Sequence, residues 1–159
     1  MKKENGLKKL RRRHGNPRVS KDPARVSIAM AAKSEALTLT ILPDRFAVCR
    51  LDKETTIPQW AFSGPFVNVT KTDNELSIVC LEAKVPAGIQ VQAGWRCLMV
   101  SGPLDFSLVG ILSSILNPLT RAGVSVFAIS TFDTDYVLVQ GEQLNTTVSA
   151  LVAAGHHVI

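Results

Sequence analysis

Cysteine is scarce in this sequence, whose 159 residues include only Cys49, Cys80 and Cys97. Their spacing matches no zinc-binding pattern, and an odd number argues against a disulfide framework. Each lies inside an apolar run, where a cysteine behaves as a small hydrophobic residue. We therefore expect reduced, buried cysteines in strands of a cytoplasmic protein.

Long apolar runs are also lacking. Hydrophobic residues make up 46% of the chain, which is enough for a core, but no run approaches the roughly 20 residues of a membrane span. No apolar segment follows the basic N-terminus, as a secretory signal would require. The sequence therefore predicts no membrane partner.

Catalytic and cofactor motifs are absent as well. There is no Gly-x-Ser-x-Gly elbow, no Gly-x-Gly-x-x-Gly and no phosphate-binding loop. His156 and His157 are adjacent in an expected strand, so they point to opposite faces and are interpreted as surface residues. We expect no enzyme, no cofactor and no metal site.

The positive charge is concentrated at the N-terminus. Ten of the 18 basic residues but only two of the 13 acidic ones lie in Met1–Ala29. Residues 1–33 are polar and have no sustained periodicity, which predicts a disordered basic tail. Three other interpretations remain open: an upstream extension with the natural start at Met30, an arm that binds nucleic acid or acidic membranes, and a transit peptide.

The first half of the remaining chain alternates short strands with single helical turns. Leu37–Ile41 and Phe46–Leu51 are expected to form a hairpin around a turn at Pro43–Arg45. Ile57–Phe62 fits one helical turn. The further expected strands are 66–70, 76–81 and 89–92.

The second half has longer elements. The run Cys97–Val100 leads into a Ser101–Pro103 turn, after which Asp105 and Ser107 offer N-cap oxygens. Apolar spacing predicts a helix over Leu108–Ala122. The next expected elements are a strand over 124–130, a polar turn over 131–135, a strand over 136–140, a helix around 144–152 and a strand over 156–159.

This order places a helix N-terminus and an acidic turn at neighbouring strand ends. The first suits an anion and the second a cation, and an amino acid carries both. Asp133 and Asp135 are the candidate cation ligands. From the residues alone, two turn aspartates that bond to their own backbone remain the alternative.

The second half resembles an ACT domain, the small-molecule-sensing module of allosteric metabolic proteins. Leu119–Val124 followed by Ala128–Phe132 and Asp135 is similar to the regulatory ACT pairs of aspartate kinases. It is more similar still to short bacterial tandem-ACT proteins related to the cytosolic arginine sensor of animal cells. The resemblance implies an α+β fold of two βαββαβ, ferredoxin-like modules: a degenerate module with shrunken helices over 34–93 and a full one over 94–159.

The resemblance also implies a ligand site. Asp135 matches the position that contacts the ligand's cationic end, with Thr131 and Phe132 lining the pocket. The Gly102–Gly110 loop matches the segment that meets the α-amino and α-carboxylate groups. Asp105, Phe106, Ser107 and Gly110 carry over from it, although an α-carboxylate would disfavour Asp105 unless that side chain caps the helix. Trp60 is interpreted as a core residue, with closure of a pocket as the alternative.

The implied function is that of a non-catalytic regulatory protein that binds a small ligand, an amino acid above all. The arginine sensor has four ACT modules whereas this chain has two, so the missing surfaces come from the first half or from a second copy in a homodimer. Two alternatives remain. The first is an accessory subunit of an amino-acid metabolic enzyme, which needs a protein partner. The second is a nucleic-acid-associated protein acting through the tail, although the mildly acidic remainder of the chain disfavours nucleic acid as a partner.

Overall fold

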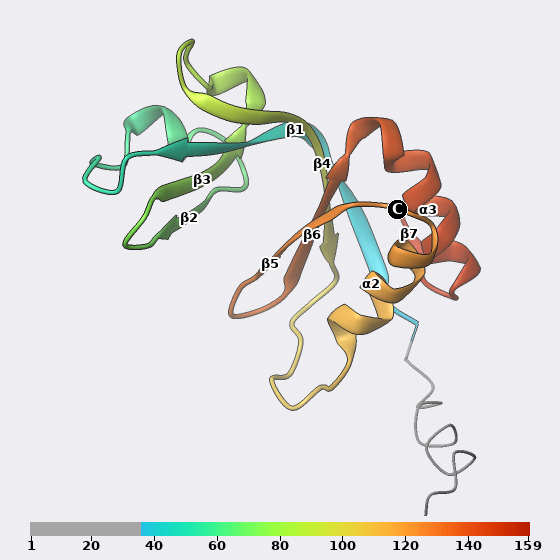
Figure 1. Ribbon diagram of the computed structural model, residues 1–159. Helices are drawn as coiled ribbons and strands as arrows, with labels where there is room; N and C mark the ends of the chain where they lie inside the picture. Colours follow the sequence, from blue (N-terminus) through green and yellow to red (C-terminus); the bar gives the residue numbers. More distant parts are fainter. Residues whose placement is uncertain (1–35) are drawn as a thin grey trace, which may run out of the picture. The chain divides into compact units, whose positions relative to one another are not determined.

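The computed structural model describes residues 36–159, so the predicted tail over residues 1–33 lies outside the described residues. The described chain is an α+β fold with helices on an antiparallel sheet (Figure 1). In order, its elements are β1 (Thr38–Leu51), the 3₁₀ helix η1 (Gln59–Phe62), β2 (Asn68–Lys71), β3 (Leu76–Leu81), the 3₁₀ helix η2 (Glu82–Lys84), β4 (Gln90–Val100), α2 (Ile111–Arg121), β5 (Val126–Ser130), β6 (Asp135–Gln140), the 3₁₀ helix η3 (Gly141–Gln143), α3 (Leu144–Ala153) and β7 (His157–Val158).

The strands form one sheet in the order β2-β3-β1-β4-β6-β5, and β7 pairs in parallel with the start of β1. The central strands β1 and β4 are long because each serves both halves of the chain. The end of β1 pairs with β3, and the end of β4 pairs with β6. The order βαββαβ is therefore used twice, with β4 closing the first unit and opening the second, which confirms the predicted ferredoxin-like class. The predicted boundary between residues 93 and 94 falls inside β4 and stays a prediction.

The predicted hairpin at the start is wrong, because β1 is one continuous strand of 14 residues. The pairing of β1 with β4 is irregular between Ile41 and Arg45 and again between Phe46 and Val48. A β-bulge of this kind accommodates a residue that cannot donate to the ladder, as is true of Pro43. The Pro–Asp–Arg sequence thus marks a bulge rather than a turn. Strand β4 is likewise continuous through Gly94, which has a φ of 83°.

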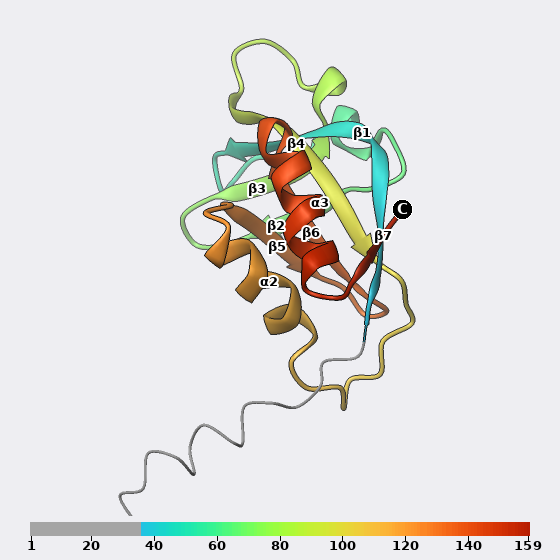
Figure 2. The ribbon, with the colours of Figure 1, turned by 90° about the vertical axis from the view of Figure 1, so that its right-hand side faces the viewer.

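The helices α2 and α3 lie side by side over one face of the sheet (Figure 2). Alternate strand residues pack against them, as half-buried strands require. This core contains fully buried side chains from strands and helices alike: Leu39, Leu98, Val100, Ile115, Leu119, Val137, Val139 and Leu151.

The opposite face of β4 and β6 is covered from the first half of the chain. Phe66 packs there beside Cys97 and Leu138 and stacks on Tyr136, with ring centroids 4.4 Å apart. A third cluster lies against η1, and Trp60 packs on it. Core packing is therefore the role that the structure gives to Trp60.

All three cysteines are buried and free, as predicted. Burial raises the pKa of Cys97 to about 12. The pKa of Cys80 is also about 12, raised by burial first and then by neighbouring Cys49. Reactivity requires the thiolate, so these thiols are kept inert. No helix among residues 36–159 has the length and apolar character to cross a membrane.

Candidate functional site

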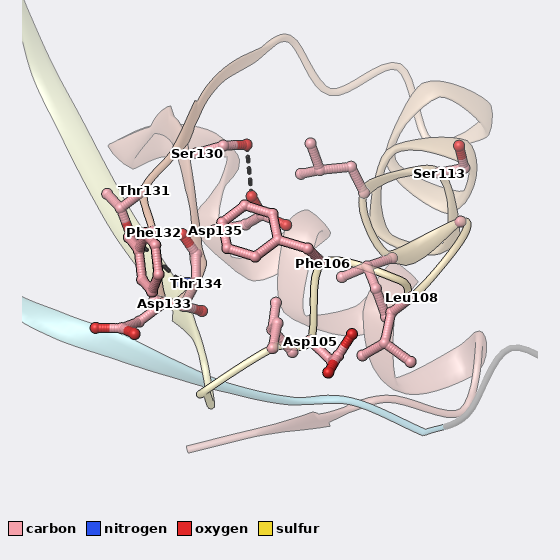
Figure 3. Close-up of a pocket in the computed structure, with 14 residues that line it drawn as sticks. Asp105, Phe106, Leu108, Ser113, Ser130, Thr131, Phe132, Asp133, Thr134 and Asp135 are labelled. Atoms are coloured by element: carbon pink, nitrogen blue, oxygen red, sulfur yellow. Dashed lines mark hydrogen bonds between the residues drawn. The ribbon is translucent and has the colours of Figure 1, made fainter.

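A pocket of about 330 Å³ opens between the loop before α2, the first turn of α2 and the turn from β5 to β6 (Figure 3). It lies beside the last residues of β4 and the first residue of β6. The sequence predicted that a helix N-terminus and an acidic turn would meet at such neighbouring strand ends. Its lining residues are Leu104, Asp105, Phe106, Leu108, Gly110, Ile111, Leu112, Ser113, Ser130, Thr131, Phe132, Asp133, Thr134 and Asp135.

The turn from β5 to β6 is closed by two threonines. The backbone N–H and the hydroxyl of Thr131 both donate to the carbonyl of Thr134, at 2.9 and 2.8 Å. The hydroxyl of Thr134 is buried and donates to the carbonyl of Val100, at the end of β4, at 2.6 Å. These bonds fix the turn against the sheet and so fix the direction of the side chains that it carries.

The loop before α2 is pinned to that turn at its first residues. The N–H of Leu104 donates to the carbonyl of Asp133 at 2.8 Å. A Cβ on Gly102 would lie 2.8 Å from the same oxygen, so only glycine allows this close approach. The two walls of the pocket are thereby joined by backbone contacts.

Asp105 does not cap the helix, contrary to the prediction. Its Oδ1 accepts the N–H of Ser107 at 2.8 Å, and its carbonyl accepts the N–H of Leu108 at 3.0 Å. The hydrogen bonds from Ser107 lower the pKa of Asp105. Helix α2 begins only at Ile111, with Gly110 as its N-cap at a φ of 88°. Asp105 therefore stabilises a turn of the loop. The apolar periodicity predicted the helix start three residues too early, because Leu108 continues the apolar spacing although its side chain is exposed.

Asp135 is half-buried at the start of β6 and faces the pocket. The hydroxyl of Ser130 donates to its Oδ1 across the last pair of β5 and β6 (Figure 3). Asp133 also lines the pocket, but its carboxylate points away from Asp135. Asp135 is thus the carboxylate that a neighbouring hydroxyl orients.

Two exposed aromatic rings flank the opening. Phe106 is 78% exposed and Phe132 is 79% exposed, and their rings meet edge to face with centroids 5.1 Å apart. They come from the two different walls of the pocket. Such a pair offers apolar surface and an electron-rich ring face to a ligand.

Six of the seven predicted site residues line this one pocket: Asp105, Phe106, Gly110, Thr131, Phe132 and Asp135. Ser107 is not among the lining residues and acts through its N–H on Asp105. Among the polar lining residues, prediction missed Ser113, Ser130 and Thr134. The signal for Ser130 was available, because it directly precedes Thr131 and must face Asp135 across a short hairpin; Ser113 could be placed only once the helix start was known.

The charges of the pocket have one sign. Among residues 36–159, the lining includes three aspartates and no lysine, arginine or histidine. The first intrahelical bond that starts α2 runs from the N–H of Ser114 to the carbonyl of Gly110, so the N–H groups of Ile111, Leu112 and Ser113 precede it. These N–H groups are the donors that a helix start directs at an anion.

Comparison with known proteins places this site in a family. A model of the ACT domain matches residues 90–153, which include the whole pocket. A crystal structure of a protein from Agobacterium tumefaciens is 40% identical, covers 79% of this chain and 94% of its own, and superposes with a TM-score of 0.76. The chain belongs to the ACT-domain family. A second model, which describes the N-terminal domain of a related group of proteins, matches residues 44–88.

Other ACT proteins resemble the chain more distantly. The cytosolic arginine sensor for mTORC1 subunit 1 of Mus musculus is 27% identical over 139 residues, which cover 68% of this chain and 42% of the sensor. The chain thus spans less than half the length of the curated relatives that it matches. The ligand-free regulatory subunit of aspartate kinase from Thermus thermophilus is 9% identical, covers 76% of this chain and 99% of its own, and has a TM-score of 0.53, which shows the shared fold.

One buried histidine supports the ACT helix that forms the pocket wall. His156 is 3% exposed, so its interpretation as a surface residue is wrong. Its Nδ1 lies 3.2 Å from the N–H of Leu37, which donates to it, and its Nε2 lies 3.1 Å from the carbonyl of Ser114 in α2. A neutral ring protonated at Nε2 satisfies both bonds. The ring ties the start of β1 to α2 just beyond the first turn.

Proposed function

We propose that this ACT-domain protein is a non-catalytic regulator that binds an amino acid with a cationic side chain in the pocket beside α2. One observation carries the proposal. The pocket sets Asp135, oriented by Ser130, across from the first turn of α2, and no basic side chain of the part of the chain that the structure describes lines it. A ligand with a positive end and a negative end matches this arrangement.

Each end of such a ligand has a stated partner. The carboxylate of Asp135 would accept hydrogen bonds from the cationic group, a charge-assisted contact worth about 1.5–3 kcal/mol. The α-carboxylate would accept from the free N–H groups that begin α2. The hydrocarbon part would lie against Phe106 and Phe132, which otherwise remain exposed. The volume of about 330 Å³ lies near the lower end of the range of roughly 300–1,000 Å³ that small-molecule sites occupy.

The relatives support the regulatory part of the proposal. The matching curated proteins are named as arginine sensors, and a similar fold is the regulatory subunit of an aspartate kinase. Regulation would follow if the ligand binds two states of the protein with different affinity, because equal affinity shifts no equilibrium. We propose that the protein is cytoplasmic and that the two states differ in homodimer contacts, with a regulated enzyme as the alternative partner.

The test is a thermal-shift screen of the full chain against the twenty amino acids. A binder raises the melting temperature by mass action, and we expect arginine or lysine to do so while glutamate does not. Asp135→Asn keeps an oxygen that accepts from Ser130 but removes the charge. It should weaken the response about ten- to a hundredfold and leave the unliganded melting temperature unchanged.

Asp133→Asn is the matched control, because Asp133 lies two residues away on the same turn and points elsewhere. It should bind like the unchanged protein. If no amino acid raises the melting temperature, the proposal fails. If Asp135→Asn lowers the stability and leaves the affinity intact, Asp135 is a structural turn residue.

A further inference from the structure

A proline inside α2 leaves one carbonyl of the pocket helix without its usual donor. In an α-helix each carbonyl accepts from the N–H four residues later in the chain. Four residues after Ser114 comes Pro118, which lies inside α2 and has no N–H. The Ser114 carbonyl is partly shielded from water, so the absence of a partner would cost stability. Its donor must therefore come from outside the helix.

His156 supplies this donor. Its Nε2 lies 3.1 Å from the carbonyl of Ser114, and its Nδ1 lies 3.2 Å from the backbone nitrogen of Leu37. Because a backbone N–H can only donate, Nδ1 must accept and Nε2 must carry the proton of the neutral ring. The ring is buried, so water does not compete for either bond. One of its two bonds thus replaces the one that Pro118 cannot make.

The backbone on both sides of the ring is itself fixed. The N–H of His156 donates to the carbonyl of Leu151 at 3.0 Å across Gly155, which has a φ of 94° and ends α3 as a left-handed cap. The N–H of His157 donates to the carbonyl of Leu37 at 2.8 Å. The ring is therefore anchored by the end of α3 and the start of β1 before it reaches α2.

The bond from the ring restrains the direction of α2. Within residues 36–159 it is the only hydrogen bond that joins α2 to a segment remote in the chain. The inward face of the helix packs through apolar side chains such as Ile115 and Leu119, and apolar contacts do not fix a direction. Ser114 in turn donates its N–H to the carbonyl of Gly110. It thus links the ring to the N-cap and to the pocket-lining residues 111–113.

We propose that His156 is a positioning residue of the pocket. It replaces the donor that Pro118 withholds and so fixes how the first turn of α2 presents its N–H groups. The inference rests on the proposed function in one respect, because the anion that meets these N–H groups is taken to be the α-carboxylate of an amino acid. The positioning itself is independent of that identity, since a shifted helix start presents its N–H groups differently to any anion.

The test is a double-mutant cycle between His156 and Pro118 in the full chain, read by denaturant unfolding. His156→Leu removes both ring bonds, and it should lower the folding equilibrium constant about a hundredfold. Pro118→Ala restores an N–H for the Ser114 carbonyl. In that background His156→Leu should lower the constant only about tenfold. Equal losses in the two backgrounds overturn the proposal.

Two NMR measurements distinguish positioning from stability alone. The ring nitrogens of the unchanged protein should show the proton on Nε2; a proton on Nδ1 overturns the proposal even if a variant fails to fold. His156→Leu should move the backbone amide signals of residues 111–113, and added Pro118→Ala should move them back. His157→Leu is the matched control, because His157 is the exposed neighbour on β7, and it should leave these signals in place. Unmoved signals in His156→Leu overturn the proposal.

Titration with arginine connects the ring to the pocket. His156→Leu should weaken arginine binding about tenfold, His157→Leu should not, and added Pro118→Ala should restore most of the affinity. If arginine does not bind the unchanged protein, the proposed function loses its expected ligand, while the cycle and the amide signals still decide the role of His156. If arginine binds and His156→Leu leaves the affinity unchanged, His156 supports the fold alone and the proposal is overturned.

Discussion

The two halves of the chain build the same turn and use it differently. In the first half, the N–H of Thr72 donates to the carbonyl of Glu75 at 2.9 Å, and the N–H of Glu75 donates to the Thr72 hydroxyl at 3.2 Å. In the second half, Thr131 and Thr134 make the same two bonds at 2.9 and 3.3 Å. The turns occupy corresponding places, between β2 and β3 and between β5 and β6.

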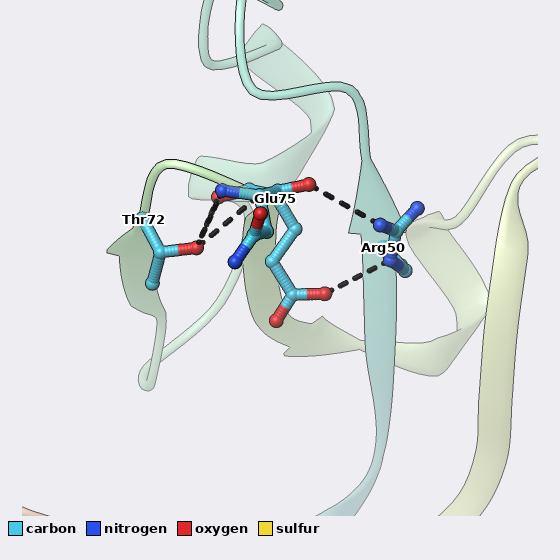
Figure 4. A network of polar contacts seen from close by, with 4 residues as sticks. Arg50, Thr72 and Glu75 are labelled. Carbon is cyan, nitrogen blue, oxygen red and sulfur yellow. Dashed lines mark hydrogen bonds and ion pairs between the residues drawn. The ribbon is translucent and has the colours of Figure 1, made fainter.

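The two turns differ in whether a basic side chain lies beside their carboxylates. Nε of Arg50 forms an ion pair with Glu75 at 2.9 Å, and its Nη2 donates to the carbonyl of Asn74 at 3.2 Å (Figure 4). Arg50 lies opposite the second residue of β3, and Met99 lies opposite the second residue of β6. Among residues 36–159, no arginine is paired beside the second turn in this way, and the carboxylate of Asp135 accepts only from the hydroxyl of Ser130.

The helices of the two halves also differ, in their length. The first half has η1 and η2, of four and three residues, where the second has α2 and α3, of 11 and 10. A single turn of helix covers less sheet and supplies no long row of N–H groups at its start. The half with long helices thus carries the pocket, and the half with short ones contributes Phe66 as packing.

Truncating a helix residue should produce the largest difference in unfolding free energy between the two halves. Leu119 of α2 is fully buried, whereas Phe62 of η1 is 55% exposed. Leu119→Ala should lower the free energy of unfolding by about 2–5 kcal/mol, because it leaves a cavity under the helix. Phe62→Ala should cost much less, and denaturant unfolding of the two variants measures the contrast. Equal losses would mean that η1 contributes as much to the core as α2 does.

A smaller effect is expected from the hydroxyl that anchors the second turn. Thr134→Val keeps the shape of the buried side chain but removes the bond to Val100, and it should cost about 0.5–1.5 kcal/mol. Thr72→Val in the first turn removes bonds that lie at the surface, so it should cost less in the same unfolding experiment. If the two variants are equally destabilised, the anchor to β4 adds nothing to the turn.

The sequence predicted the fold class and six of the residues that line the pocket, because both depend on local signals. Apolar periodicity located α2, and the resemblance located Thr131, Phe132 and Asp135. Prediction from the sequence failed where tertiary pairing overrides local preference. Pro43 is a turn signal that long-range pairing with β4 absorbed into a bulge, and His156 is buried only because Leu37 and Ser114, each more than 40 residues away, converge on it. The pairing of Arg45 with Arg96 could not be predicted either, because it depends on the register of the irregular pairing of β1 with β4.

The smallest effect concerns the ion pair that distinguishes the first turn. Arg50→Met gives the first turn the residue that the second has at the corresponding place. The side chains of Arg50 and Glu75 are 49% and 37% exposed, so water and salt screen their attraction, and such pairs contribute at most about 1 kcal/mol. The loss should shrink further in 1 M salt, where the screening length falls to about 3 Å. Unfolding at low and high salt measures both values. A loss that persists at high salt would show that Arg50 acts through its bond to the Asn74 carbonyl rather than through its charge, so that what the second turn lacks is a hydrogen-bond donor rather than a cation.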